Sequence, residues 1–329
     1  MIPCEWIDAA EKRISRYVHR TPFTYDQELN IYLKWENQQE TGSFKIRGAI
    51  NKILSLEPWE REAGLVAASA GNHGAGVALA ARETHSKAII FVSSNAVQSK
   101  IEQIREFGAE VRFVEGGYGE AEKAGLAYAN STNASWISPY NDGQIIAGQA
   151  TLGMEILREL PDPENTTWVV PVGGGGLMAG IACAVACTFH SSRIKNHEKI
   201  TNPTKRPRLI AVQSEASPFF HEIYHRGSQE GVIELESIAD GLAGRIEQNS
   251  TTIPILRRYV DDFILVSERQ IIEAIIFSWE RYRQRIEGSA AVAIAAILGN
   301  KTRIDPAVAI ITGGNIQPEV HINLCSQKG

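Results

Sequence analysis

Cysteine is scarce in this sequence, with four residues in a chain of 329. The cysteines form no C-x-x-C pair and lie among no clustered histidines, so neither a zinc motif nor a dithiol redox motif is indicated. Cys183 and Cys187 stand four apart in an apolar helical pattern, which favours two buried free thiols. So few cysteines in a long chain favour a reducing compartment.

The sequence also lacks clusters of basic residues and any uninterrupted apolar segment long enough to cross a membrane. The formal net charge is −5, and no cluster of lysine and arginine carries interleaved aromatics, so we expect no nucleic-acid partner. The first residues lack the basic and apolar segments of a secretory signal. Residues 168–189 carry no charge and are long enough to cross a bilayer, but Pro171 and four consecutive glycines interrupt them. We therefore expect a cytoplasmic protein with no membrane partner.

The composition, 43% hydrophobic and 22% charged, is sufficient for a large buried core. Short apolar or β-branched runs alternate with segments of helical periodicity. This alternation predicts a largely parallel sheet with helices on both faces and ligands beyond the carboxyl ends of its strands. A polar stretch at 191–206 is predicted to be a surface connection. The predicted strands are 31–35, 64–68, 88–92, 110–114, 168–170, 208–212 and 307–311, and the predicted helices include 74–82, 99–107, 118–130 and 149–159.

A run of four glycines, residues 173–176, lies between a predicted strand and an alanine-rich helix. Glycines let backbone N–H groups turn toward a phosphate, and the helix start adds the positive end of a dipole. A tight structural turn is one alternative, although four glycines weaken a helix start unless something approaches the backbone. Gly174, Gly176 and Ala179 also match G-x-G-x-x-A, so a dinucleotide is a second alternative. Such sites use a strand-end acid about 20 residues further on, and Glu215 comes much later.

Three further segments carry side chains that suit one aromatic ligand. Lys45 follows Phe44 in the hexamer SFKIRG, where a solvated lysine beside a core phenylalanine is the alternative to a reactive amine. The turn at 69–74 opens a helix of small residues, whose N–H groups suit a carboxylate. Asn72 in that turn can donate to a phenolate oxygen, although an ordinary helix cap is the alternative. Thr312, after the last strand, can offer a hydroxyl to a ring nitrogen or simply belong to a turn.

An amine, a phosphate cradle, an amide and a hydroxyl together describe a pyridoxal 5′-phosphate (PLP) site. The motifs SFKIRG, SAGNHG, VGGGGL and TGGN, in that order, resemble those of the fold-type II PLP enzymes, above all the branch of serine/threonine dehydratases and serine racemases. Segments at 105–111, 145–151, 239–243 and 287–290 resemble the same branch, so the resemblance covers nearly the whole chain. It implies an α/β fold with two open, mostly parallel sheets flanked by helices, like that of the tryptophan synthase β-subunit.

The resemblance also implies a role for each matching residue. Lys45 would form the Schiff base with PLP and remove the Cα proton, and Phe44 would pack against the ring. A large PLP-binding domain would comprise 1–59 and 138–329, and a small mobile domain would comprise 60–137. The phosphate would be bound by Gly173, Gly174, Gly175, Gly176 and Leu177, the ring by Asn72 at O3′ and Thr312 at the nitrogen, and the substrate carboxylate by Ser69, Ala70, Gly71, Asn72 and His73.

The implied activity is that of an ammonia-lyase: dehydration and deamination of a β-hydroxy amino acid such as L-threonine or L-serine to a 2-oxo acid and ammonia. A neutral hydroxyl at Thr312 would leave the ring nitrogen largely unprotonated, which favours loss of a β-leaving group. Racemases of this branch carry an acid/base serine at the position of Ala70, so racemisation is expected to be weak. A racemase or a β-replacement synthase of the same family is the alternative.

Two positions bear on metal binding and specificity. The divalent-cation site of the branch resembles Glu-x3-Ala-x-Asp, but here Glu215 is followed at those spacings by Phe219 and His221, so no metal is expected. Arg245 is either a surface residue or one that faces an unusual β-substituent, as in a 3-hydroxyaspartate-type substrate. The segment ADGLAG before it also resembles dehydratase-like proteins associated with hydroxyectoine breakdown. A homodimer is the expected assembly.

Overall fold

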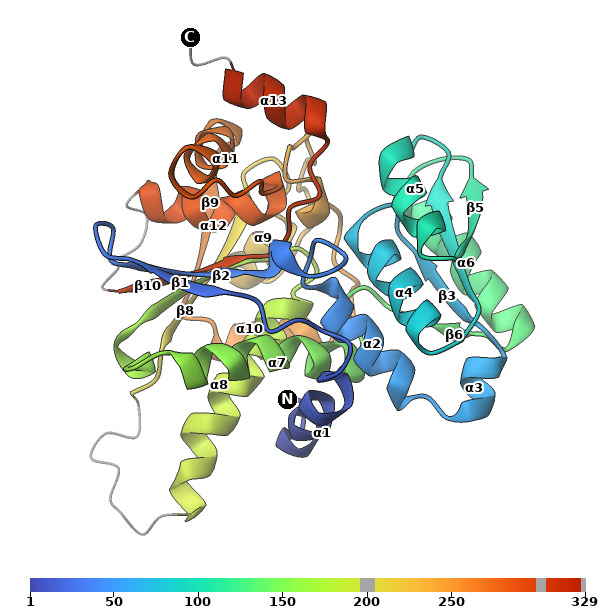
Figure 1. Ribbon diagram of the computed structural model, residues 1–329, viewed down its shortest axis with the longest axis horizontal. Helices are drawn as coiled ribbons and strands as arrows, with labels where there is room; N and C mark the ends of the chain where they lie inside the picture. The colour runs from blue at the N-terminus through green and yellow to red at the C-terminus, as the bar shows by residue number, and fades with distance from the viewer. Residues whose placement is uncertain (196–204, 300–305, 327–329) are drawn as a thin grey trace.

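Two β-sheets organise the computed structural model, which describes residues 1–195, 205–299 and 306–326 (Figure 1). In the larger sheet only the β1–β2 pair is antiparallel, and in the smaller sheet all pairs are parallel. The predicted α/β fold with two mostly parallel sheets is therefore confirmed. The larger sheet has the order β1 (Phe23–Asp26), β2 (Ile31–Trp35), β10 (Ala307–Ile311), β7 (Thr167–Pro171), β8 (Arg208–Ser214), β9 (Asp262–Val266), and the smaller has the order β5 (Glu110–Val114), β4 (Ala88–Ser93), β3 (Leu65–Ala68), β6 (Ser135–Trp136).

Helices cover both faces of the larger sheet (Figure 1). β7 and β10 are buried along their whole length, which explains why their sequences are continuous apolar runs rather than alternating ones. One face of the larger sheet packs against α1 (Cys4–Ile14), α7 (Gly143–Glu159), α8 (Gly176–Lys195), α9 (Phe219–Arg226) and α10 (Thr252–Tyr259), and the other against α11 (Glu268–Tyr282) and α12 (Gly288–Leu298). The helix α13 (Pro318–Ser326) packs on α11.

The smaller sheet, on the right of Figure 1, packs against α4 (Asn72–Glu83) and α5 (Gln98–Glu106) on one face and against α6 (Tyr118–Thr132) on the other. The helix α2 (Lys45–Ser55) contacts both α4 and α7 and so joins the two sheets, and α3 (Pro58–Glu62) follows it. All four strands of this sheet lie between residues 60 and 137, the range predicted for the small domain. Movement of that range as one unit stays a prediction.

Arg47 anchors α2 from within the core. Its side chain is fully buried, with Nε donating to Glu36 Oε2 at 2.7 Å and Nη1 donating to Glu155 Oε1 at 2.7 Å. Lys34 is also fully buried and pairs with Glu155 at 2.8 Å. Each buried charge thus has a partner, as a low-dielectric interior requires. Because Lys45 is the first residue of α2, this network also fixes the start of the helix, two residues before Arg47.

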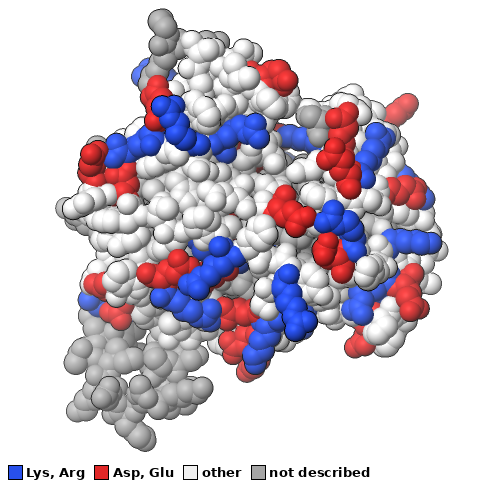
Figure 2. Space-filling view, in the orientation of Figure 1, with Lys and Arg blue, Asp and Glu red and all other residues white. Residues whose placement is uncertain are grey.

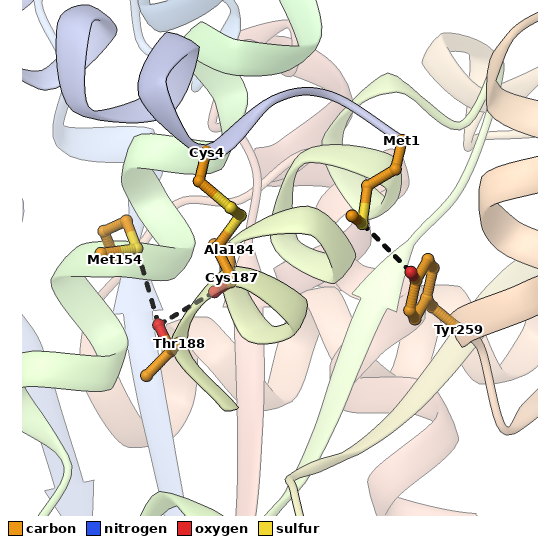
Figure 3. Close-up of a disulfide and its surroundings, with 7 residues drawn as sticks. All are labelled: Met1, Cys4, Met154, Ala184, Cys187, Thr188 and Tyr259. Carbon is orange, nitrogen blue, oxygen red and sulfur yellow. Dashed lines mark hydrogen bonds between the residues drawn. A yellow bond between two sulfur atoms is a disulfide. The ribbon is translucent and has the colours of Figure 1, made fainter. Parts of the chain in front are cut away.

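A disulfide joins Cys4, at the start of α1, to Cys187 in α8 (Figure 3). The prediction of a buried free thiol is therefore confirmed for Cys183 and wrong for Cys187. The two bonded residues are 183 positions apart in the sequence. A spacing of four along one helix carries no information about such a distant contact.

Two further segments stand out in the sequence. Residues 168–189 comprise most of β7, the glycine run and most of α8, and within the described ranges no helix combines the length and hydropathy of a membrane span. Of the polar stretch at 191–206, predicted to be a surface connection, residues 191–195 continue α8 and residues 196–204 lie outside the described part. On the face shown in Figure 2, basic and acidic side chains are interspersed over the described residues.

Candidate active site

The glycine run connects β7 to α8 at the carboxyl end of a central strand. Gly175 has φ +85°, a left-handed conformation that glycine adopts without strain. The Gly174 carbonyl accepts a hydrogen bond from Thr252 Oγ1 at 2.8 Å, which fixes the loop. Among the described residues, the amides of 173–178 have no hydrogen-bond acceptor in the protein. The next amide, that of Ala179, donates to the Gly175 carbonyl. The N–H groups of 173–178 are therefore open at the N-terminus of a 20-residue helix, an arrangement that binds phosphate.

Tyr140 covers this loop. A Cβ added at Gly174 would lie well inside van der Waals contact of the Tyr140 ring, and one at Gly176 would meet Tyr140 Cα at 3.0 Å. The Tyr140 hydroxyl accepts a hydrogen bond from the Glu247 amide at 3.0 Å, and burial raises the pKa of the phenol above its usual range. The glycines are thus needed for the close approach of a side chain as well as for open N–H groups.

The amine of Lys45 contacts Pro139, the residue before Tyr140. Its Nζ donates to the Pro139 carbonyl at 3.0 Å and lies 5.3 Å from the centroid of the Phe44 ring. The side chain is half-buried, and loss of solvation lowers the pKa of Lys45 to about 8, with Glu287 acting in the opposite sense. This amine is therefore neutral more often near pH 7 than a solvated lysine, and it lies beside the loop that can hold a phosphate.

The turn at 69–73 follows β3 and leads into α4. Ser69 Oγ accepts a hydrogen bond from the Gly71 amide at 3.2 Å. Among the described residues, the next amide along the chain that donates to the turn is that of Ala75, whose acceptor is the Gly71 carbonyl. The N–H groups at the start of α4 are therefore available to a carboxylate. The His73 ring is turned inward, where its Nε2 donates to the Ile137 carbonyl at 2.8 Å, and burial lowers the pKa of His73 to about 3. His73 is thus a neutral, fixed side chain, and only its backbone faces the turn.

Asn72 lies between two residues that the sequence did not single out. Its Nδ2 donates to Glu287 Oε1 at 2.7 Å, and its Oδ1 accepts from Asn315 Nδ2 at 2.7 Å. Glu287 begins the segment 287–290, which resembles the dehydratase and racemase branch, and Asn315 ends the TGGN motif. The sequence therefore marks both as parts of family-like motifs but predicts no function for either. Three segments far apart in the sequence therefore meet at the Asn72 amide.

Thr312 follows β10 and is 3% exposed. Its carbonyl accepts a hydrogen bond from the Phe44 amide at 3.0 Å, and the neighbouring Gly313 pairs with Ser43 in an isolated bridge. These two contacts hold the residues just before Lys45 against the TGGN segment. The predicted ring-nitrogen partner and the predicted Schiff-base lysine are thereby brought to one place.

Among the described residues, neither Arg245 nor His221, which stands at one position of the family's cation-site pattern, is joined to this arrangement by a side-chain hydrogen bond. Arg245 is half-exposed, pairs with Glu230 at 2.8 Å and stacks its guanidinium over the Phe219 ring. His221 Nδ1 contacts Glu222 Oε1 at 3.0 Å. Within the described residues no three His, Cys, Asp or Glu side chains gather as metal ligands.

The donor groups fit PLP. A phosphate is matched by the open N–H groups of 173–178, an aldehyde by the amine of Lys45, and a phenolic oxygen by the N–H of Asn72 that Glu287 leaves free. Thr312 adds a hydroxyl that carries no charge. These groups come from the ends of β7, β3 and β10 and from the start of α2, the positions where parallel sheets bind ligands.

Comparisons with known proteins agree with this chemistry. The model of the family described as pyridoxal-phosphate dependent enzyme matches residues 14–313. An L-threonine ammonia-lyase of Thermotoga maritima is 41% identical in an alignment of 323 residues, which covers 96% of this chain and 76% of that protein. A catabolic L-threonine dehydratase of Escherichia coli is 37% identical, over 93% of this chain and 91% of its own length. Among solved structures, maize serine racemase superposes with a TM-score of 0.85 at 30% identity, over 97% of this chain and 95% of that one.

Proposed function

Since the chain belongs to the pyridoxal-phosphate dependent enzymes, we propose that it is an ammonia-lyase for a β-hydroxy amino acid such as L-threonine or L-serine. The products are the 2-oxo acid and ammonia. The observation that carries the proposal is the amine of Lys45, with its lowered pKa, bonded to the Pro139 carbonyl next to Tyr140, the residue that packs on the glycine run. The two relatives named for threonine deamination support the choice of substrate class.

When bound, PLP supplies an electron sink for the charge that develops at the substrate Cα. The residues of the chain do the rest. The N–H groups of 173–178 would bind the phosphate, and those at the start of α4 would orient the substrate carboxylate. Lys45 Nζ takes the Cα proton, because a pKa of about 8 leaves part of the amine neutral at working pH. The uncharged Thr312 hydroxyl would face the ring nitrogen, and a partner without charge would favour loss of the β-hydroxyl over return of the proton.

A racemase is the second candidate, because maize serine racemase shares this fold at 30% identity. Racemisation needs a second acid/base on the face opposite Lys45, and the segment that faces the substrate has Ala70 there, which holds no transferable proton. We therefore propose that elimination dominates. Arg245 stays a candidate for specificity, although its ion pair with Glu230 is that of a surface arginine.

The test is a parallel assay of ammonia, 2-oxo acid and D-amino acid with L-threonine, L-serine and 3-hydroxyaspartate. We expect 2-oxobutanoate or pyruvate to form in equal amounts with ammonia, and expect K45A to lose this activity. The matched variant A70S restores a hydroxyl and is expected to raise D-serine formation. Racemisation that exceeds ammonia release in the unmodified enzyme would refute the proposal.

We also propose a homodimer, the commonest closed assembly, and a cytoplasmic location. Light scattering on a size-exclusion column tests the first. The scarcity of cysteine supports the second, whereas the Cys4–Cys187 disulfide opposes it, because cytosolic thiols are normally kept reduced. Alkylation of thiols in intact cells, read as a mass shift, distinguishes a reduced pair from an oxidised one.

A further inference from the structure

The side-chain amide of Asn72 is fixed by a chain of hydrogen bonds that begins at a backbone carbonyl. Asn315 Nδ2 donates to the Thr41 carbonyl at 2.8 Å and also to Asn72 Oδ1 at 2.7 Å. Asn72 Nδ2 in turn donates to Glu287 Oε1 at 2.7 Å. The chain therefore runs from Thr41 through two amides to a carboxylate.

Only one orientation of each amide satisfies this chain. The Thr41 carbonyl can only accept, so the atom of Asn315 that faces it must be the nitrogen. That nitrogen also faces Asn72, so Asn72 must present its oxygen there and its nitrogen on the other side. The nitrogen of Asn72 carries two N–H groups, of which Glu287 takes one. Within the part of the chain that the structure describes, the other N–H has no acceptor and is open to a ligand.

The backbone around Asn315 is built to keep this arrangement. Gly42 has φ +70°, and a Cβ at this position would overlap the Asn315 side-chain oxygen. The Gly314 amide donates to the Gly42 carbonyl at 2.9 Å. Gly42 thus supplies both the left-handed turn and the space that lets Asn315 approach Thr41 and Asn72.

Glu287 faces charged groups from several elements. It is 8% exposed, and burial together with Asp240 raises the pKa of its carboxyl to about 7. The hydrogen bond from Asn72 and the charge of Lys100 act in the opposite sense, and Glu287 itself raises the pKa of Lys45. In either protonation state the carboxyl keeps an oxygen that accepts from Asn72.

We propose that Glu287 and Asn315 are positioning residues, which hold the Asn72 amide with its second N–H directed at the ring oxygen of the cofactor. The inference rests on the proposed placement of that oxygen beside Asn72. Neither positioning residue needs to touch the cofactor. Each acts on the ring oxygen through Asn72. At a pH above about 9, where the amine of Lys45 is mostly neutral with or without Glu287, removing either residue therefore has no further effect once Asn72 is gone.

The experiment is a double-mutant cycle on PLP affinity at this pH, measured by titrating apoenzyme and following the visible absorbance of the bound cofactor. We expect N72A and E287A each to weaken PLP binding by roughly tenfold, the value of about one hydrogen bond. The double variant N72A/E287A is expected to stay within about twofold of N72A alone. Effects that multiply instead would overturn the inference, because they mean that Glu287 acts independently of Asn72.

Further variants separate positioning from folding. E287Q keeps an acceptor oxygen and is expected to bind PLP within about threefold of the unmodified enzyme; a loss as large as that of E287A would overturn the inference. N315A, cycled with N72A, repeats the test if E287A does not fold. E268Q is the matched control: Glu268 is a carboxylate that accepts from Ser214 and Ser237 and takes no part in the chain of amides.

The outcomes distinguish the inference from the placement on which it rests. If N72A binds PLP like the unmodified enzyme, the proposed contact between Asn72 and the ring oxygen is wrong. If N72A binds weakly while E287A and N315A bind normally, the contact stands and the positioning role alone is refuted. Thermal unfolding of each apoenzyme confirms that the compared variants are folded.

Discussion

Replacing Glu36 by glutamine tests the buried ion network that holds α2. Glu36 is fully buried, and its carboxylate accepts from Arg47 Nε at 2.7 Å, from Arg47 Nη2 at 2.8 Å and from the Thr21 hydroxyl. A glutamine keeps the shape of the side chain, but its NH2 group replaces one acceptor oxygen. That group would face the N–H donors of Arg47 or the hydroxyl of Thr21 and could accept from neither. The Arg47 guanidinium then retains only Glu155 as a charged partner.

The expected loss is large on the scale of protein stability. Removing one partner of a buried ion pair costs about 3 to 5 kcal/mol, because the remaining charge is left without compensation. At about 2.1 cal/mol/K per residue, the 329 residues give an unfolding entropy of about 0.7 kcal/mol/K. The midpoint of thermal unfolding should therefore fall by roughly 4 to 7 °C.

The assay is differential scanning calorimetry at one fixed PLP concentration, since bound cofactor shifts the midpoint. E40Q is the control, because Glu40 and Arg82 form a half-exposed pair at 2.9 Å that is expected to contribute under 1 kcal/mol. E36Q should unfold well below E40Q. Equal midpoints for the two variants would show that the network is not a stabilising anchor and refute the reasoning.

Three further predictions concern the amine, the glycine run and the disulfide. The rate at which apoenzyme binds PLP should rise with pH and level off above about 8, since only neutral Lys45 attacks the aldehyde; a rise that continues to pH 10 in stopped-flow absorbance would contradict the lowered pKa. G174A should weaken PLP binding at least about tenfold, because its Cβ meets Tyr140, whereas G119A, which has no neighbour within 4 Å, should bind normally. A disulfide typically contributes about 2 to 4 kcal/mol to the free energy of unfolding, so a reductant should lower the unfolding midpoint by roughly 3 to 6 °C. The reductant should leave the midpoint of C187S unchanged. Equal sensitivity of both proteins would exclude a stabilising disulfide.

Elements with a strong local pattern could be predicted from the sequence. The continuous apolar runs of β7 and β10 predicted buried parallel strands, and the glycines at 173–176 predicted a turn between a strand and a helix, because in both cases the signal lies within a few neighbouring residues. Phosphate binding by this turn stays a prediction. β9 was missed. In the described sheet it is an edge strand beside β8. Four of its five residues are apolar, but so short an apolar run does not distinguish a strand from a helix by periodicity.

Contacts between distant residues could not be predicted in the same way. Asn72 and Glu287 are 215 residues apart, and Asn72 and Asn315 are 243 apart, so nothing near Asn72 indicates what orients its amide. His73 illustrates the same difficulty on a smaller scale. The sequence placed it in the substrate turn, but the helix begins at Asn72, and this sets the ring of the next residue against Ile137 in the interior.

The bond between Cys4 and Cys187 closes residues 4–187 into a covalent ring. All four strands of the smaller sheet, β3, β4, β5 and β6, are part of this ring. A single cut of the backbone inside this ring opens it without releasing a fragment. Such a nicked chain keeps its full mass on a non-reducing gel and falls into two pieces only when the disulfide is reduced. The ring also limits how far the ends of the smaller sheet can separate when that part of the chain unfolds locally.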